Sequence, residues 1–184
     1  MMNTPKYLLQ NVEKYPNEPA ISIKDSSGNW QTKTWNDFYN SVMAISKSLI
    51  ASGINKNDKV SIYSYNRLEW NICYLASQMI NSVAVGVYHT CSSNEVNWIV
   101  GNSDSKIVFL GNNPNDNNEE EKMPNHRLSA VLNELENVDL VVAMNGVEPF
   151  EHEKVISWEE FVAKGVDVKE SEVSERCESI EPND

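Results

Sequence analysis

Cys91 and His89, two residues apart, are the side chains in this sequence closest to a nucleophile and its base. A thiol beside an imidazole can act as a nucleophile, because the imidazole accepts the thiol proton. The same pattern is typical of a polar turn that follows a strand, and we favour that interpretation. The pair therefore supplies no catalytic assignment.

Two further groups of residues have both a functional and a structural interpretation. Asn66 and Glu69 could form a polar site, but their spacing is that of a capping box at the start of a helix. Trp35, Phe38 and Trp70 could form an aromatic ligand site, but their helical spacing is typical of core residues. We predict the structural role for both groups.

Metal-binding side chains are not grouped in the sequence. The histidines and cysteines are His89, His126, His152, Cys73, Cys91 and Cys177. They form no CxxC pair, and no two of the histidines have the spacing of metal ligands. We expect no metal site, and we expect free thiols in a reducing compartment rather than a disulfide framework.

A nucleotide-binding loop is not recognisable in the chain. The seven glycines are isolated, and neither GxGxxG nor GxxxxGK[ST] occurs. Ligands of α/β sheets bind at the carboxyl ends of the strands. Those ends are expected at Ser64–Asn66, Gly86–Thr90, Leu110–Gly111 and Ala143–Asn145. None resembles a phosphate loop, so we assign no catalytic, cofactor-binding or metal-binding residue and leave the substrate pocket open.

The elements that must position these residues alternate between strand and helix patterns. Thr34 and Asp37 have capping-box spacing, and Gly53 suits the C-terminal end of the helix that they begin. The expected strands are 20–24, 30–33, 59–64, 83–87, 107–110 and 139–143, and the expected helices are 4–15, 35–52, 68–79, 93–100, 126–137 and 158–162. The first two strands form a hairpin. The remaining alternation predicts a three-layer α/β/α sandwich with a mostly parallel sheet, whose strand order stays open.

Two polar segments are expected outside the core. Residues 111–125 are dominated by Asn, Asp, Glu and Pro, and residues 165–184 are acidic without a clear apolar period. Such compositions bury too little apolar surface to offset the entropy cost of ordering, so we expect both segments to be mobile. We accordingly divide the chain into an α/β domain at 1–164 and an acidic linker at 165–184.

Length and charge exclude several classes of protein. The chain has 184 residues, 40% of them hydrophobic, which is enough for one folded domain. The net charge of -12, with only 15 Lys and Arg residues, disfavours nucleic-acid binding and docking on anionic lipid. No secretory leader and no apolar stretch of membrane-spanning length is evident, so we expect a cytoplasmic protein.

Several runs of residues resemble the adenylate-forming (AMP-binding) superfamily when taken in order. The runs are Trp35–Tyr39, Ala51–Ile54, Asn57–Val60, Ser64–Trp70, Ala76–Tyr88, Glu95–Val100 and Ser103–Phe109. Within the superfamily, the "N-R-x-E-W" and "V-G-V-Y" runs are most similar to long-chain fatty acyl-CoA synthetases. The resemblance covers about Thr4 to Phe161 and implies the N-terminal α/β subdomain of such an enzyme.

The resemblance implies a parent reaction in which fatty acid, ATP and CoA give acyl-CoA, AMP and pyrophosphate. ATP, Mg and CoA would serve the full-length parent, but the phosphate loop and the catalytic lysine of the family have no counterpart before Asp184. We therefore expect an N-terminal fragment that binds no cofactor and is inactive alone. The alternatives are a fragment of an aryl or short-chain acid ligase, or a stand-alone α/β binding or interaction module.

The same resemblance implies partners. The remainder of the parent enzyme would pack against this domain and share an acyl pocket with it, and the parent could be membrane-peripheral. Without that partner, apolar side chains near Tyr88 and an uncovered sheet edge would face water. We therefore expect self-association, most simply as a symmetric homodimer.

Overall fold

The computed structural model describes residues 3–25, 27–112 and 123–181. Its strands are β1 (Pro19–Lys24), β2 (Trp30–Thr34), β3 (Lys59–Ser64), β4 (Val83–Tyr88), β5 (Ser105–Gly111), β6 (Leu140–Ala143) and β7 (Val155–Ile156). Its helices are α1 (Thr4–Lys14), α2 (Trp35–Ala51), α3 (Leu68–Met79), α4 (Ser93–Asn102), α5 (Pro124–Ser129), α6 (Trp158–Lys164) and α7 (Glu170–Glu178), with a 3-10 turn η2 at Leu132–Glu134.

Five strands form one parallel sheet in the order β4-β3-β5-β6-β7. Residues of β3 pair with β4 on one side and with β5 on the other, so β3 is an interior strand and β4 is an edge. This arrangement confirms the predicted parallel α/β sheet and supplies the strand order that the sequence left open. Strand β7 was not predicted, because its two residues are too few for a recognisable pattern.

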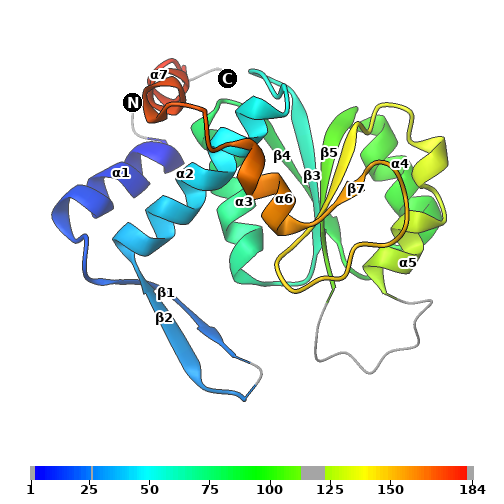
Figure 1. Ribbon diagram of the computed structural model, residues 1–184, viewed down its shortest axis with the longest axis horizontal. Helices are drawn as coiled ribbons and strands as arrows, with labels where there is room; N and C mark the ends of the chain where they lie inside the picture. The colour runs from blue at the N-terminus through cyan, green and yellow to red at the C-terminus, as the bar shows by residue number, and fades with distance from the viewer. Residues whose placement is uncertain (1–2, 26, 113–122, 182–184) are drawn as a thin grey trace.

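Helices cover both faces of the sheet, as the three-layer prediction required (Figure 1). Helices α2, α3 and α6 lie against one face, and α4 and α5 lie against the other. The hairpin β1–β2 extends away from this body as a separate two-stranded sheet. A side-chain hydrogen bond of 2.8 Å between Ser22 and Thr32 joins its two strands.

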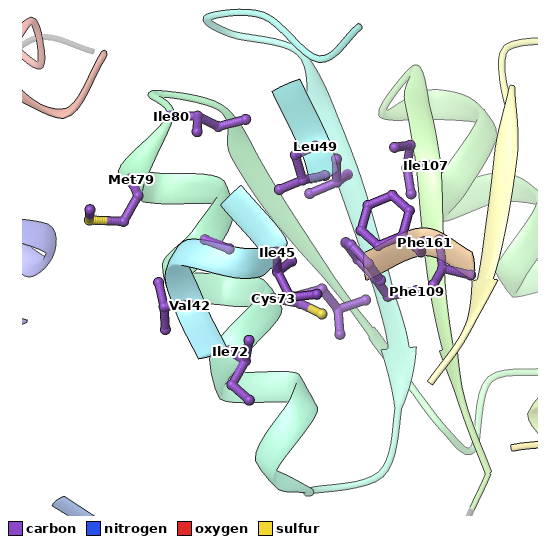
Figure 2. Packing of buried hydrophobic residues seen from close by; sticks show 14 of the residues in the cluster. Val42, Ile45, Leu49, Ile72, Cys73, Met79, Ile80, Ile107, Phe109 and Phe161 are labelled. Carbon is purple, nitrogen blue, oxygen red and sulfur yellow. The ribbon is translucent and has the colours of Figure 1, made fainter. Parts of the chain in front are cut away.

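The larger core fills the space between the sheet and helices α2, α3 and α6 (Figure 2). Alternate residues of the parallel strands point into it, including Val60 and Ile62 from β3, while Tyr63 points to the opposite core under α4. Each face therefore receives every second residue of the strand, as the pleat of a β-strand requires. Because both faces of the sheet are covered by helices, consecutive residues of its interior strands are buried, and such strands are rich in apolar residues.

Capping explains where several helices begin. The side chain of Thr34 accepts from the Asp37 N–H, and the Asp37 carboxylate accepts from the Thr34 N–H, so the predicted capping box of α2 is confirmed. Ser92 caps α4 and Ser157 caps α6 in the same way. Hydrogen bonds from Thr34 are the largest cause of a lowered Asp37 pKa.

The predicted helix at 126–137 is wrong. Helix α5 ends at Ser129, and the chain continues through the 3-10 turn η2. The apolar residues Leu128, Val131, Leu132 and Leu135 recur at helical spacing and are all buried against the sheet. A broken helix can bury that set of residues as well as a continuous one, so the period alone did not identify the break.

The expectation of a solvated segment after Gly165 also requires correction. Residues 170–178 form α7, in which Val173 and Cys177 are buried in the larger core. Helix α7 is held by the Tyr39 hydroxyl, which donates to Glu170 at 2.8 Å, and by the Arg176 guanidinium, which donates to the Ile54 carbonyl at 2.7 Å. Two buried positions one turn apart are sufficient to hold a helix that is otherwise acidic. The expected mobility of 113–122 and 182–184 lies outside the described residues.

Candidate functional site

An open cleft lies at the carboxyl end of the sheet, where ligands of α/β folds are bound. Its volume is about 970 Å³. One wall is strand β1 of the hairpin at residues 21–24, and the other is formed by the β3–α3 connection at 64–71, the end of β4 at 86–89, and Asn112. We call this space the carboxyl-end cleft. It is the place where the protruding hairpin and the main sheet approach each other.

Aromatic and aliphatic side chains make up much of the wall. Ile21 and Ile23 contribute from β1, and Trp70 contributes from the first turn of α3. The rings of Tyr65 and His89 are stacked with centroids 3.7 Å apart, and they join the end of β3 to the end of β4. The cleft can therefore accept an apolar or flat group along most of this wall.

Arg67 is the structural centre of the β3–α3 connection. Its Nε donates to Glu69 Oε2 at 2.7 Å, its Nη1 donates to the Asn112 carbonyl at 3.4 Å, and its Nη2 donates to the Asn145 carbonyl. Asn112 follows β5 and Asn145 follows β6, so one guanidinium ties the ends of three neighbouring strands together. Lysine could not reproduce this, because an ammonium lacks the planar fork of donors.

The predicted capping box at Asn66 and Glu69 is wrong. Helix α3 begins after Arg67, which makes no side-chain capping bond, and Asn66 is exposed beside the cleft. Glu69 is 9% exposed and pairs with Arg67 instead. The sequence signal for this pair was the Arg67–Glu69 spacing, but that spacing also occurs on ordinary solvated helix ends.

His89 and Cys91 belong to a turn, as expected. The Cys91 N–H donates to the Tyr88 carbonyl at 2.9 Å, which closes the turn after β4. The His89 ring stacks on Tyr65, whereas Cys91 packs against the core that lies under α4. The two side chains thus have different neighbours, and the structure gives no support to a nucleophile–base pair.

The side chains of Arg127 and Tyr63 donate hydrogen bonds to backbone carbonyls of the turn after β4. Arg127 donates to the Cys91 carbonyl at 2.9 Å and to the His89 carbonyl at 3.3 Å. The Tyr63 hydroxyl donates to the same Cys91 carbonyl at 3.1 Å, and burial raises the pKa of Tyr63 to about 12. Tyr63 is therefore a neutral hydrogen-bond donor at physiological pH.

The remaining predicted site residues lie in the core or on separate surfaces. Phe38 is buried and Trp35 packs against the larger core, which confirms the structural role of these two residues. Trp70 packs against the same core and also lines the carboxyl-end cleft. The three cysteines are free, and burial raises the pKa of both Cys73 and Cys177. His126 lies in α5, and His152 accepts from the Lys154 N–H at Nδ1 and donates from Nε2 to Asn133 Oδ1 at 3.1 Å. Neither histidine lines the cleft.

The cleft lining does not by itself fit a magnesium-bound nucleotide. Binding a triphosphate requires backbone N–H donors, a cation and carboxylates directed to one place. The donors of Arg67 point to Glu69 and to two carbonyls of the protein. Of the other lining residues, Lys24 has its Nζ over the Trp30 ring at 5.2 Å, and Glu69 is the one carboxylate among the described lining residues. Within 3–25, 27–112 and 123–181, no group of three metal-binding side chains occurs either.

Removing the Arg67 guanidinium should destabilise the chain. We expect Arg67→Met to lower the free energy of unfolding by about 2–3 kcal/mol, since a nearly buried Glu69 carboxylate and two carbonyls lose a charged donor. Urea unfolding measures this as a lower midpoint at constant slope. Arg67→Met combined with Glu69→Gln should recover part of the loss, and Lys33→Ala on the exposed hairpin should change stability by less than about 0.5 kcal/mol. Wild-type stability for Arg67→Met would refute the role of Arg67.

Comparison with known proteins identifies the relatives of this chain. The family model described as "AMP-binding enzyme" matches residues 8–183. Long chain acyl-CoA synthetase 5 of Arabidopsis thaliana is 28% identical over 165 residues, which is 84% of this chain and 23% of the relative. The human long-chain-fatty-acid–CoA ligase ACSBG2 is 21% identical over 99% of this chain and 26% of its own length. The chain thus spans about a quarter of the length of each of these two relatives.

Solved structures share the fold. A mutant form of coronafacic acid ligase from Pectobacterium brasiliense superposes with a TM-score of 0.75 at 17% identity, over 91% of this chain and 30% of the ligase. At that identity the similarity establishes the α/β architecture alone. Across the described part of the chain, no helix is both long and apolar enough to cross a bilayer.

Proposed function

The chain belongs to the AMP-binding enzyme family, and from this premise we propose that it is the N-terminal part of an ATP-dependent long-chain fatty acid–CoA ligase. The parent reaction would join a fatty acid to CoA, with ATP converted to AMP and pyrophosphate. The observation that carries the proposal is the match to long-chain acyl-CoA synthetases over most of this chain but only about a quarter of their length. The proposal includes a cytoplasmic location, because all three cysteines are free thiols.

The carboxyl-end cleft is the surface that we assign to the parent reaction. It is open, it lies at the ligand-binding end of the sheet, and its walls carry Ile21, Ile23, Trp70 and Tyr88. We propose that the remainder of the enzyme closes over this cleft and that the two parts together hold the fatty acyl chain. ATP, Mg and CoA would then be bound by the remainder, since the cleft lining directs no set of donors and carboxylates at a triphosphate.

The isolated 184-residue chain is therefore expected to be inactive. We expect no pyrophosphate release above a heat-denatured control when it is mixed with ATP, Mg²⁺, CoA and palmitate, and a full-length acid–CoA ligase serves as the positive control. The physical reason is that transition-state charge on the phosphates would have no preorganised donors. Palmitate-dependent turnover by the isolated chain would show that the catalytic groups lie within it.

Acid specificity separates long-chain ligation from its alternatives. A longer product of the same gene should release pyrophosphate faster with palmitate than with benzoate or acetate. Preference for benzoate or acetate would instead identify an aryl or short-chain acid ligase. A gene product that activates no acid would favour the stand-alone binding or interaction module.

A further inference from the structure

We propose that the carboxyl-end cleft binds a long-chain fatty acid without the remainder of the enzyme, with the acyl tail on Gly86 and Trp70 and the carboxylate near Lys24. The inference deepens the proposed function and rests on it for the class of acid. Three observations carry it, which are a missing side chain on β4, the apolar walls around that gap, and the charge of the cleft lining.

Gly86 leaves a gap at the end of a row of side chains that crosses the sheet. In the register of the strands, Phe109 of β5 lies beside Ile62 of β3, and Ile62 lies beside Gly86 of β4. Directly paired residues point to the same face of a sheet, which here is the face of the larger core. Phe109 and Ile62 are fully buried, whereas Gly86 is exposed. The row therefore ends in bare backbone that lines the cleft.

Neither the backbone nor the packing requires glycine at position 86. Its φ is not positive, so a residue with a side chain can adopt the same conformation. Among the described residues, the nearest atom to an added Cβ is Cζ2 of Trp70, at an ordinary 3.8 Å. Glycine weakens the interior of a strand and often marks a place where a ligand approaches the backbone closely. We assign the gap to a ligand group that lies on the backbone of residue 86.

The walls around Gly86 fit a slender apolar chain. The indole of Trp70 lies beside the gap and is stacked on Tyr74, with ring centroids 5.5 Å apart. Ile21 and Ile23 line the wall that β1 forms, and residues two apart on a strand share a face and lie about 7 Å apart. The cleft volume of about 970 Å³ is within the range of about 300–1,000 Å³ that is typical of ligand pockets. An extended hydrocarbon chain can contact both isoleucines and the indole.

The cleft lining has the opposite charge to the chain as a whole. Its charged side chains are Lys24, Arg67 and Glu69, of which Arg67 and Glu69 pair at 2.7 Å. Lys24 ends β1 and has its Nζ over the Trp30 ring, and it makes no ion pair within the described residues. Two cations and one carboxylate give the described lining a net charge of +1, on a chain of net charge -12. A single unpaired cation beside apolar walls suits a monoanion with an apolar tail, which is the form of a fatty acid.

Calorimetric titration of the 184-residue chain with monomeric palmitate tests the proposal. We expect saturable binding of one palmitate per chain. Gly86→Val should weaken that binding about tenfold or more, because valine fills the gap. It should leave the urea midpoint unchanged or higher, since valine suits a strand better than glycine. Gly101→Ala adds a side chain to a glycine of α4, outside the described cleft lining, and should leave palmitate binding unchanged.

A second variant pair tests the position of the carboxylate. Lys24→Met should weaken palmitate binding about two- to fivefold, as expected for loss of one exposed ion pair. It should leave the binding of hexadecanol unchanged, because the alcohol has the same tail and no charge. Lys33→Met removes a lysine of the same hairpin that is not among the described lining residues, and it should change neither affinity.

Two results would overturn the proposal, which are no saturable palmitate binding by the wild-type chain and undiminished binding by Gly86→Val. Either would leave the gap to a side chain from the remainder of the enzyme. Equal weakening by Lys24→Met and Lys33→Met would refute the position of the carboxylate. A longer gene product that activates palmitate, with an isolated chain that does not bind it, would support the proposed function and overturn this inference. Palmitate binding by the isolated chain, with a longer product that prefers benzoate, would support the site and refute long-chain ligation.

Discussion

Phe109→Ala should lower the free energy of unfolding by about 3–5 kcal/mol, one of the two largest effects that we expect from a single substitution. Phe109 lies on the interior strand β5 and is fully buried. Its ring meets that of Phe161 edge to face at 5.4 Å and lies 6.4 Å from the ring of Trp158. Figure 2 shows Phe109 and Phe161 packed together where α6 docks on the sheet. Truncation of Phe109 would leave a cavity at this place.

Urea unfolding at one fixed protein concentration measures this loss, with the slope checked for constancy. Trp98→Ala removes an aromatic ring that is 68% exposed and should change stability by less than about 0.5 kcal/mol. A loss below about 1 kcal/mol for Phe109→Ala would show that α6 does not depend on this ring cluster.

Gly111→Ala should also lower the free energy of unfolding substantially, because it adds an atom to a crowded site instead of removing a side chain. A Cβ at this position would lie 2.0 Å from Ser64 Oγ, 2.7 Å from Ser64 Cβ and 2.9 Å from Met144 Sδ. The ends of β3, β5 and β6 come together at residue 111 and leave no space for a side chain, so glycine is required there. Overpacking of such a site costs about 1–3 kcal/mol, and we expect the upper end because two of these atoms belong to a side chain that is itself buried.

A compensating substitution and a matched control make this expectation specific. Ser64→Gly in the Gly111→Ala background removes both Ser64 contacts and should restore part of the lost stability. Gly101→Ala in α4 places a Cβ at an ordinary 3.6 Å from Leu135 and should be neutral or stabilising by up to about 1 kcal/mol. Equal effects at the two glycines would contradict the proposed crowding at residue 111.

The sequence predicted those parts of the fold that depend on local pattern. Alternating strands and helices, the capping box at Thr34 and the helical spacing of Trp35 and Phe38 were sufficient for α2 and the parallel sheet. The Asn66–Glu69 spacing matched the same capping template, but Glu69 pairs with Arg67 because the guanidinium is held there by carbonyls from two distant strands. Contacts between residues so far apart in the sequence cannot be recognised from the spacing of neighbouring residues.

Other features depended on tertiary contacts in the same way. Helix α7 forms because Val173 and Cys177 reach the larger core, although the segment is acidic. The strand ends at 64–66 and 86–89 line the carboxyl-end cleft, at the positions where the sequence placed the carboxyl ends of the strands. The wall formed by residues 21–24 of β1 was not predicted, because it depends on where the hairpin lies relative to the sheet. Apolar exposure near Tyr88 was expected from the family resemblance, and Tyr88 is 78% exposed. Which strand forms the edge could not be derived, since strand order is set by the whole sheet and the residues of β4 are as apolar as those of the buried strands.

The proposal that this chain is the N-terminal part of an acid–CoA ligase is tested most directly by the nucleotide sequence beyond the codon for Asp184, read from both transcript and genomic DNA. We expect coding sequence that continues into a Ser/Thr/Gly-rich phosphate-binding loop with a lysine, followed by the remainder of an adenylate-forming enzyme. Downstream DNA that encodes no such loop would contradict the proposal and make the stand-alone module the better interpretation.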